Sequence, residues 1–211
     1  MKKIIALCIL TSISLAGLAQ TQWGIFAGPQ VTTAKYFITG NKQDVSNKFG
    51  FQAGLSCKIP FEKNLYFSPA AFYSMKGYKV NFNGISDPPD SLAINNNTTF
   101  HTFELAVLLQ YNFGNKPGHF FIKAGPSLDF QLLGNEKYDR SDNTTVDRSM
   151  TFSFVNYGRY AANVLLHFGY ETAKGLMIFG QYTYGIGNLN NHDEGPRILH
   201  RAYGISVGKY F

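Results

Sequence analysis

The chain has 211 residues, a formal net charge of +6 at pH 7 and a 16% share of aromatic side chains, with 13 Tyr and 19 Phe. This excess of positive charge is too small to indicate a nucleic-acid-binding protein. Two cysteines are too few for a disulfide framework, and after the first 19 residues no apolar run approaches the roughly 20 residues of a membrane-spanning helix.

The chain begins with the pattern of a secretory signal peptide. Two lysines precede an apolar run over residues 4–15, and small residues follow it before Gln20. We therefore expect residues 1–19 to be a cleaved signal peptide and residues 20–211 to form one domain. Removing those 19 residues would leave 192 of the 211, and losing two lysines would lower the net charge from +6 to +4.

The segment from Phe103 to Phe113 shows the period that dominates the rest of the chain. Its odd-numbered positions all carry bulky apolar side chains, whereas its even-numbered positions include Glu104, Gln110 and Asn112. Successive side chains of a β-strand point to opposite faces of the sheet. The alternation therefore predicts a strand with one apolar face and one more polar face.

Eight segments alternate in this way: residues 23–37, 48–60, 65–82, 98–113, 119–133, 151–170, 176–189 and 197–211. Long polar stretches follow the first, third, fifth and seventh segments, and short turns follow the second, fourth and sixth. Long loops then lie at one end of a meandering sheet and short turns at the other. This pattern predicts an all-β fold, an eight-stranded antiparallel up-and-down transmembrane β-barrel.

A soluble carrier of the lipocalin kind is an alternative with the same strand order, but with an apolar interior and a polar exterior. An eight-stranded barrel has room inside only for side chains. The polar faces of the predicted strands are rich in Gly, Ala and Ser, and the apolar faces carry Phe, Tyr and Leu. Small side chains inside and bulky ones outside favour a barrel that faces lipid.

Seven segments, in their order along the chain, resemble the PorT-like family of eight-stranded outer-membrane β-barrels of Bacteroidota: GIFAGPQVT, FGFQAGLSCKI, LYFSPAAFYSMKGYKV, HTFELAVLLQYNF, FFIKAGPSLDF, GQYTYGIGNLN and RAYGISVGKYF. Ala70 and Ala106 depart from the family, which often has Glu and Pro there. The resemblance implies a location in the cell outer membrane, with outer membrane lipid and lipopolysaccharide as neighbours. One relative is linked to protein secretion, so a surface or secretion-system protein is a candidate partner.

The last predicted strand ends in the terminal aromatic residue typical of outer-membrane barrels, and one of its faces carries Tyr203, Ile205, Val207 and Phe211. The resemblance implies that this face is the signal read by the barrel-assembly machinery during insertion. Residues 204–208 also match G-x-S-x-G, the nucleophile elbow of serine hydrolases, which needs a following helix and a later acid and histidine. Only five residues follow Ser206, so we expect an inward-facing strand residue there and no catalysis.

Several charged or ionisable side chains project onto the predicted interior: Lys58, Lys76, Glu104, Lys123, Asp129, Arg159 and His167. A buried charge is costly unless it is paired, and both signs are present in this set. The pattern therefore predicts a salt-bridged polar network that fills the lumen. The functional alternatives are an ion or proton path, or a lipid-modifying site with His167 as the base.

These patterns together predict a structural or surface-interaction barrel whose long loops bind a partner. No catalytic, cofactor-binding or metal-binding residues are expected, and no nucleic acid. The alternatives are a lipid-modifying enzyme of the outer membrane, a narrow pore and the soluble carrier.

Overall fold

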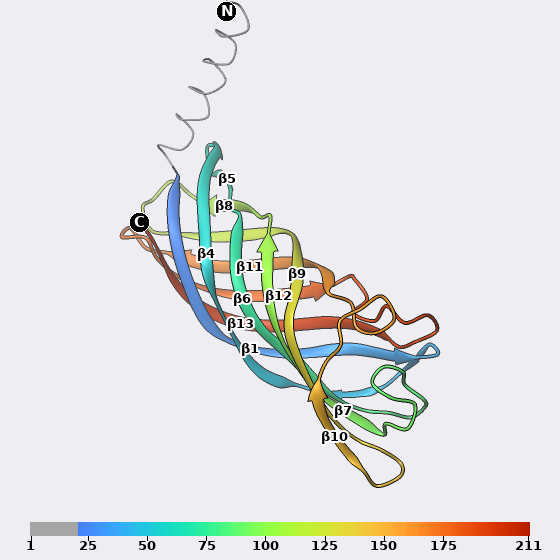
Figure 1. The fold of residues 1–211 in the computed structure, drawn as a ribbon. Helices are drawn as coiled ribbons and strands as arrows, with labels where there is room; N and C mark the ends of the chain where they lie inside the picture. The colour runs from blue at the N-terminus through green and yellow to red at the C-terminus, as the bar shows by residue number, and fades with distance from the viewer. Residues whose placement is uncertain (1–20) are drawn as a thin grey trace, which may run out of the picture.

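The computed structural model describes residues 21–211, and the predicted signal peptide lies outside this range. The described residues form one antiparallel sheet that closes on itself (Figure 1). Its thirteen strands are β1 (Gln22–Ile38), β2 (Asn41–Lys42), β3 (Asp44–Ser46), β4 (Lys48–Glu62), β5 (Leu65–Phe67), β6 (Ala70–Asn81), β7 (Asn95–Ala106), β8 (Leu109–Phe113), β9 (His119–Asp139), β10 (Thr145–Ser149), β11 (Tyr160–Glu171), β12 (Leu176–Gly185) and β13 (Arg197–Tyr210). Within residues 21–211, no helix is long and apolar enough to cross a membrane.

The wall of the barrel has eight positions, which confirms the predicted fold. Going around the ring, these are β1, β4, the pair β5 and β6, the pair β7 and β8, β9, β11, β12 and β13. The ring closes because β1 pairs with β13 on one side and with β4 on the other. Strands β2, β3 and β10 extend the sheet at one end only.

The two ends of the barrel differ in the length of their connections. At the turn end, residues 63–64, 114–118 and 172–175 join neighbouring strands, and Gly114 and Gly175 adopt positive φ angles of 88° and 77° that favour glycine. At the loop end, residues 39–47, 82–94, 140–159 and 186–196 form the long connections. The start of β1 and the C-terminus both lie at the turn end (Figure 1), as an even number of strands requires.

The structure corrects some predicted bounds at the loop end. The sixth predicted strand begins at Tyr160 and not at residue 151, and the seventh ends at Gly185 and not at residue 189. The long stretch predicted after the fifth strand is partly a hairpin, because β9 continues to Asp139 and pairs there with β10. Alternation by itself does not separate wall strands from paired loops.

The two faces of the wall follow the predicted alternation. In β7 and β8, Leu105 and Leu109 are exposed on the outer face, and Glu104 and Gln110 are buried inside. Bulky residues are not confined to the outside, however. A turn-side core fills the lumen near the turn end with Phe26, Ala70, Phe72, Ala106, Leu108, Phe121, Leu165, Met177, Phe179 and Tyr210. Ala70 and Ala106 are small as expected, but the expectation of small inward side chains is wrong at the other positions, because an eight-stranded lumen is wide enough to need filling.

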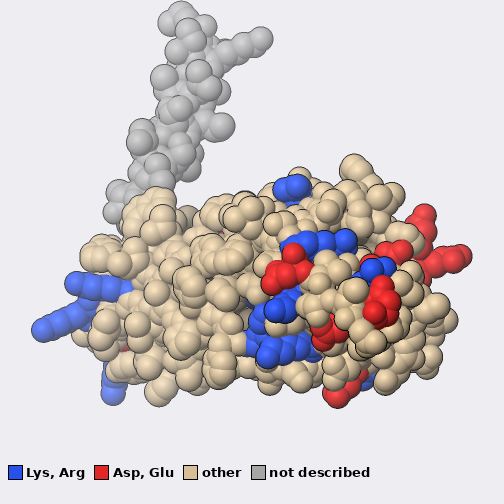
Figure 2. Space-filling model, turned by 60° about the horizontal axis from the view of Figure 1, so that its bottom comes forward, with Lys and Arg blue, Asp and Glu red and all other residues tan. Residues whose placement is uncertain are grey.

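A second apolar layer, the loop-side core, fills the lumen near the loop end. Its buried members are Ala34, Tyr36, Ile38, Tyr78, Val80, Phe100, Met150, Tyr157, Ala161, Leu189 and Ile198. The outer surface shows the complementary pattern: Figure 2 shows a broad area without charged side chains between basic side chains at the turn end and a mixture of both signs at the loop end.

Candidate functional sites in a filled barrel

A buried ionic triad lies between the two apolar cores. Lys76 of β6 places its Nζ atom 2.8 Å from Glu104 Oε2 and 2.8 Å from Asp129 Oδ2. Ser127 donates a 2.5 Å hydrogen bond to Glu104 Oε1. All three charged side chains are buried. One cation therefore neutralises two carboxylates across three neighbouring positions of the wall, β6, β7 and β9.

A layer of amides occupies the lumen beside the triad. Gln30 Nε2 donates to Ser74 Oγ at 2.8 Å, and Gln52 Nε2 donates to Ser206 Oγ at 3.0 Å and to the side-chain oxygen of Gln181. Ser206 thus contacts an amide and not a base. The structure places it on the inward face of the closing strand, where the sequence predicted it.

The remaining residues of the predicted interior network lie apart from the triad. Lys123 donates a 2.8 Å hydrogen bond to the Tyr210 hydroxyl, and His167 stacks on Phe179 with ring centroids 5.0 Å apart. Arg159 is a correction, since it is exposed in the loop before β11 and its guanidinium lies over Phe152. The predicted strand extended too far toward the loop end, so it wrongly included Arg159 in the wall.

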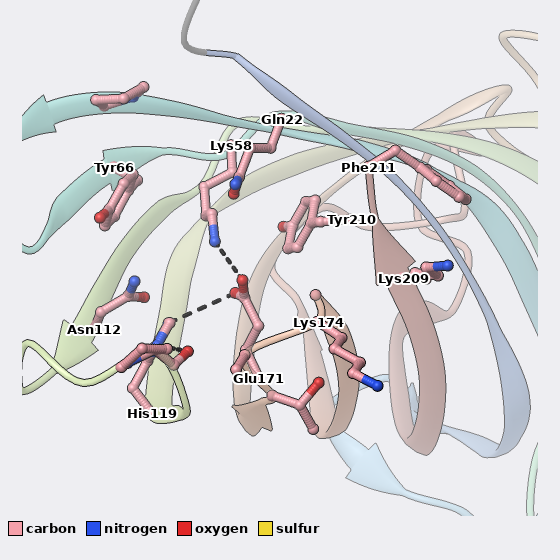
Figure 3. A pocket seen from close by; sticks show the side chains of 15 residues that line it. Gln22, Lys58, Tyr66, Asn112, His119, Glu171, Lys174, Lys209, Tyr210 and Phe211 are labelled. Atoms are coloured by element: carbon pink, nitrogen blue, oxygen red, sulfur yellow. Dashed lines mark hydrogen bonds and ion pairs between the residues drawn. The ribbon is translucent and has the colours of Figure 1, made fainter.

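The turn end opens into a vestibule of about 720 Å³ (Figure 3). Lys58 of β4 and Glu171 of β11 meet at its base, with Nζ 2.6 Å from Oε1, and His119 Nε2 lies 3.6 Å from Glu171 Oε2. The Lys58 ammonium also lies 4.7 Å from the centre of the Tyr210 ring. The vestibule ends where the side chains of the turn-side core begin.

At the loop end, a set of contacts ties the long connections together, and we call this region the loop cap (residues 82–94 and 134–159). Glu136 of β9 accepts hydrogen bonds from Tyr157 at 2.8 Å and from Arg148 at 2.8 Å. Arg148 also donates to the Pro89 carbonyl at 2.8 Å. Burial raises the pKa of the Tyr157 hydroxyl well above its ordinary value, so this group stays a neutral donor at physiological pH.

A second set of contacts holds the 82–94 loop down onto the barrel. The Tyr36 and Ser86 hydroxyls lie 2.6 Å apart inside the loop-side core, and Arg140 Nε lies 3.3 Å from Asp90 Oδ2. The cap is therefore a packed structure and not a set of independent loops. Within residues 21–211, no three His, Cys, Asp or Glu side chains come together as a metal site.

The structure places the predicted assembly signal on the outer face of β13 and at the terminus. Tyr203, Ile205, Val207 and Phe211 are all exposed. Tyr182 of the neighbouring β12 stacks on Tyr203 with ring centroids 4.9 Å apart.

Comparison with protein families matches residues 18–191 to the outer membrane protein beta-barrel domain. The chain belongs to this family. The protein therefore lies in the outer membrane, its apolar outer face contacts lipid, and the loop end and turn end are its extracellular and periplasmic ends. The buried charges inside and the apolar exterior are the reverse of a soluble carrier.

Solved structures of small barrels are similar in fold. Ail of Yersinia pestis, solved with the heparin analogue sucrose octasulfate, is 12% identical, with 90% of this chain and 99% of that chain covered and a TM-score of 0.47. Neisserial surface protein A is 12% identical (89% and 97% covered, TM-score 0.42). OprG of Pseudomonas aeruginosa is 14% identical (90% and 95% covered, TM-score 0.42). No curated protein matches the chain.

Sequence reasoning missed several residues that the structure brings into these sites. Glu171 shares the inward face of β11 with His167, four residues earlier, so the period of two contains a signal for it. Glu136 lies in the stretch taken for an irregular loop, and its partner Tyr157 lies in a segment taken for a strand. No local pattern in the sequence indicates their contact.

Proposed function

We propose that this protein acts at the cell surface as a non-catalytic binding protein, and that its loop cap is the binding surface. The observation that carries the proposal is a packed cap with large exposed apolar side chains above a filled lumen. Phe154 is 93% exposed, Ile85 is 73% exposed, and Val155 is exposed beside Phe154. Side chains this exposed bury little apolar surface within the fold, and apolar side chains exposed on a protein surface often mark binding sites for other proteins when they gather in a patch.

The filled lumen supports binding over transport. A solute would have to pass the turn-side core, the ionic triad and the loop-side core in turn. Aromatic side chains from non-adjacent strands meet inside both cores; for example, Phe26 packs edge-on against Phe72 and against Phe179, with ring centroids 5.5 Å and 5.8 Å apart. Opening a path would require these packed rings to move together.

The contacts beneath the cap support a preformed binding surface. Arg148 links β10 to Glu136 and to the Pro89 carbonyl, and Tyr157 links the 150–159 loop to the same carboxylate. A surface that is already ordered loses less conformational entropy when it binds. The exposed Phe154 and Val155 lie within a few residues of Tyr157, so this anchor positions them.

Photo-crosslinking tests the proposal directly. A benzoylphenylalanine at position 154 should form a discrete protein adduct when cells of the native host are irradiated, and the same probe at Lys116 in a periplasmic turn should not form that adduct. No adduct at position 154, or the same adduct at both positions, would contradict binding through the cap.

We further propose the narrower assignment to the PorT-like barrels of Bacteroidota, which rests on the order of the seven segments that resemble that family. A surface or secretion-system protein is then the partner class to examine first. An alignment with PorT-like sequences should keep all seven segments in register, and gaps that fall inside the strands would contradict the assignment.

A further inference from the structure

A shallow apolar groove of about 410 Å³ lies across the outer face of β12, β13, β1 and the start of β4. Its lining includes Val31, Phe49, Gly180, Tyr203 and Ile205. The groove exists partly because position 180 has no side chain: a Cβ atom there would meet only the Phe168 carbonyl oxygen, at 3.9 Å. The groove is lined mainly by apolar atoms, and in the outer membrane it faces the hydrocarbon.

An arginine with unused hydrogen-bond donors lies at the extracellular end of this groove. Arg201 is two residues beyond Tyr203 on β13, it pairs with Thr33 of β1 and Tyr184 of β12, and it is only 4% exposed. Its Nη1 atom donates to the Gly185 carbonyl at 2.8 Å and to the His200 carbonyl at 2.7 Å.

The other nitrogens of the Arg201 guanidinium have no hydrogen-bond partner. Its Nε and Nη2 atoms are buried without a hydrogen bond, and none of the ion pairs of residues 21–211 includes this side chain. The Tyr184 ring lies over it, 3.6 Å from the guanidinium carbon to the ring centroid, and is itself 42% exposed. A buried charge without an anion is costly, and a rotation of the Tyr184 side chain would open it to one.

Two exposed cations continue the line toward the loops. Lys35 of β1 lies two residues beyond Thr33, and Arg197 pairs with Phe37 at the start of β13. Neither takes part in an ion pair of the described chain. The outer face of the β1–β13 pair therefore changes from an apolar groove to three cations within a few residues.

The level on the barrel wall at which the apolar groove gives way to cations matches the boundary of the outer leaflet. At a rise of ~3.3 Å per residue and a tilt of ~40°, the ten residues from Trp23 to Thr33 climb about 25 Å, the height of the apolar band of an outer-membrane barrel. Arg201 lies opposite Thr33. Tyr182, Tyr184 and Tyr203 cluster at the same level, as expected of an interfacial aromatic girdle.

We propose that this groove binds an acyl chain of lipopolysaccharide and that Arg201, assisted by Lys35 and Arg197, binds a phosphate of its lipid A. The groove supplies an apolar channel on the lipid side, and the cations supply charge complementarity at head-group height on the extracellular side. A guanidinium presents paired N–H donors that match phosphate oxygens. The site is separate from the loop cap and does not depend on the proposed partner binding.

Native mass spectrometry of the refolded barrel in detergent tests the site, with diphosphorylated lipid A, the same lipid without phosphates, and phosphatidylglycerol as probes. Wild-type protein should bind diphosphorylated lipid A at least about tenfold more tightly than either other lipid. Arg201→Gln should weaken that binding about tenfold, equivalent to about 1.4 kcal/mol. Gly180→Leu should also weaken it, because the added side chain fills the groove.

Matched variants separate a specific site from general attraction to charge. Lys79→Gln removes an exposed lysine from the loop end of β6 and should leave lipid A binding unchanged, whereas Lys35→Gln should reduce it even if Arg201→Gln fails to fold. Equal loss in Lys79→Gln and Lys35→Gln, or lipid A binding unaffected by Gly180→Leu, would overturn the proposal. Equally tight binding of phosphatidylglycerol would overturn the choice of lipopolysaccharide as the ligand.

Discussion

Lys58 and Glu171 meet across the periplasmic mouth of the lumen, with 2.6 Å between the ammonium nitrogen and a carboxylate oxygen. Their strands, β4 and β11, occupy opposite positions of the eight-membered ring. Both side chains are buried, so the pair is a cross-brace in a region of low dielectric constant and not a surface ion pair.

We expect this pair to be energetically coupled. In a double-mutant cycle with Lys58→Met and Glu171→Gln, the coupling energy should be about 1–3 kcal/mol, in the range measured for contacting residues. Urea unfolding in lipid vesicles, followed by the fluorescence of Trp23, provides the free energies, since Trp23 is the one tryptophan of the sequence and faces lipid. Additive effects of the two substitutions would show that the brace contributes nothing.

The geometry of the ionic triad predicts that two substitutions will lower the free energy of unfolding by different amounts. Lys76→Met leaves two carboxylates buried without a cation and should cost about 3–5 kcal/mol of unfolding free energy. Glu104→Gln keeps the Lys76–Asp129 pair and should cost less. The same urea titration measures both, and a larger loss in Glu104→Gln would mean that Lys76 does not neutralise both acids.

The closing strand predicts a contrast between Ser206 and Phe211. Ser206→Ala removes one buried hydrogen bond to Gln52 and should cost about 1 kcal/mol, with no effect on insertion. Deleting Phe211 should reduce the amount of protein that reaches the outer membrane, because the terminal aromatic belongs to the proposed assembly signal. Membrane fractionation of expressing cells measures both. Normal insertion without Phe211 would remove that residue from the signal.

The contacts of the loop cap predict that loss of one hydroxyl will make the cap less ordered. Tyr157→Phe keeps the ring in the loop-side core but breaks the hydrogen bond to Glu136. Cleavage by trypsin after Arg148 or Arg159, on intact cells, should become faster, whereas Tyr160→Phe, on the exposed outer face of β11, should cleave like the wild type. Equal cleavage rates in all three proteins would show that this bond does not order the cap.

The sequence was sufficient for the wall of the barrel, because a strand buries alternate residues and the period of two holds along most of the wall. It is interrupted near the loop end, where residues 76–78 of β6 and 198–202 of β13 are all buried. The sequence also placed Lys76, Glu104 and Asp129 on the inward face. The sequence was not sufficient to predict which side chains fill the lumen. Periodicity shows on which face of a strand a residue lies, but it does not give the width of the lumen. The inward Phe26, Phe72 and other core aromatics were missed for that reason.

The loop end was least predictable for a different physical reason. Arg159 was expected inside because the predicted alternation continues through residues 151–159, but that segment leaves the wall and returns Tyr157 to the core. Such a path depends on contacts between residues distant in the chain, such as Tyr157 with Glu136. Arg201 was missed because alternation places it on the outer face of β13 with Tyr203 and Ile205, and nothing in the sequence pattern indicates that it is buried.

We propose that packed side chains close the lumen, so that the protein binds at the surface and does not conduct. Planar-bilayer recording of the refolded wild-type protein tests this most directly. We predict no steady conductance above that of the protein-free bilayer. A steady, large, voltage-independent conductance would contradict the closed lumen and, with it, a function limited to binding.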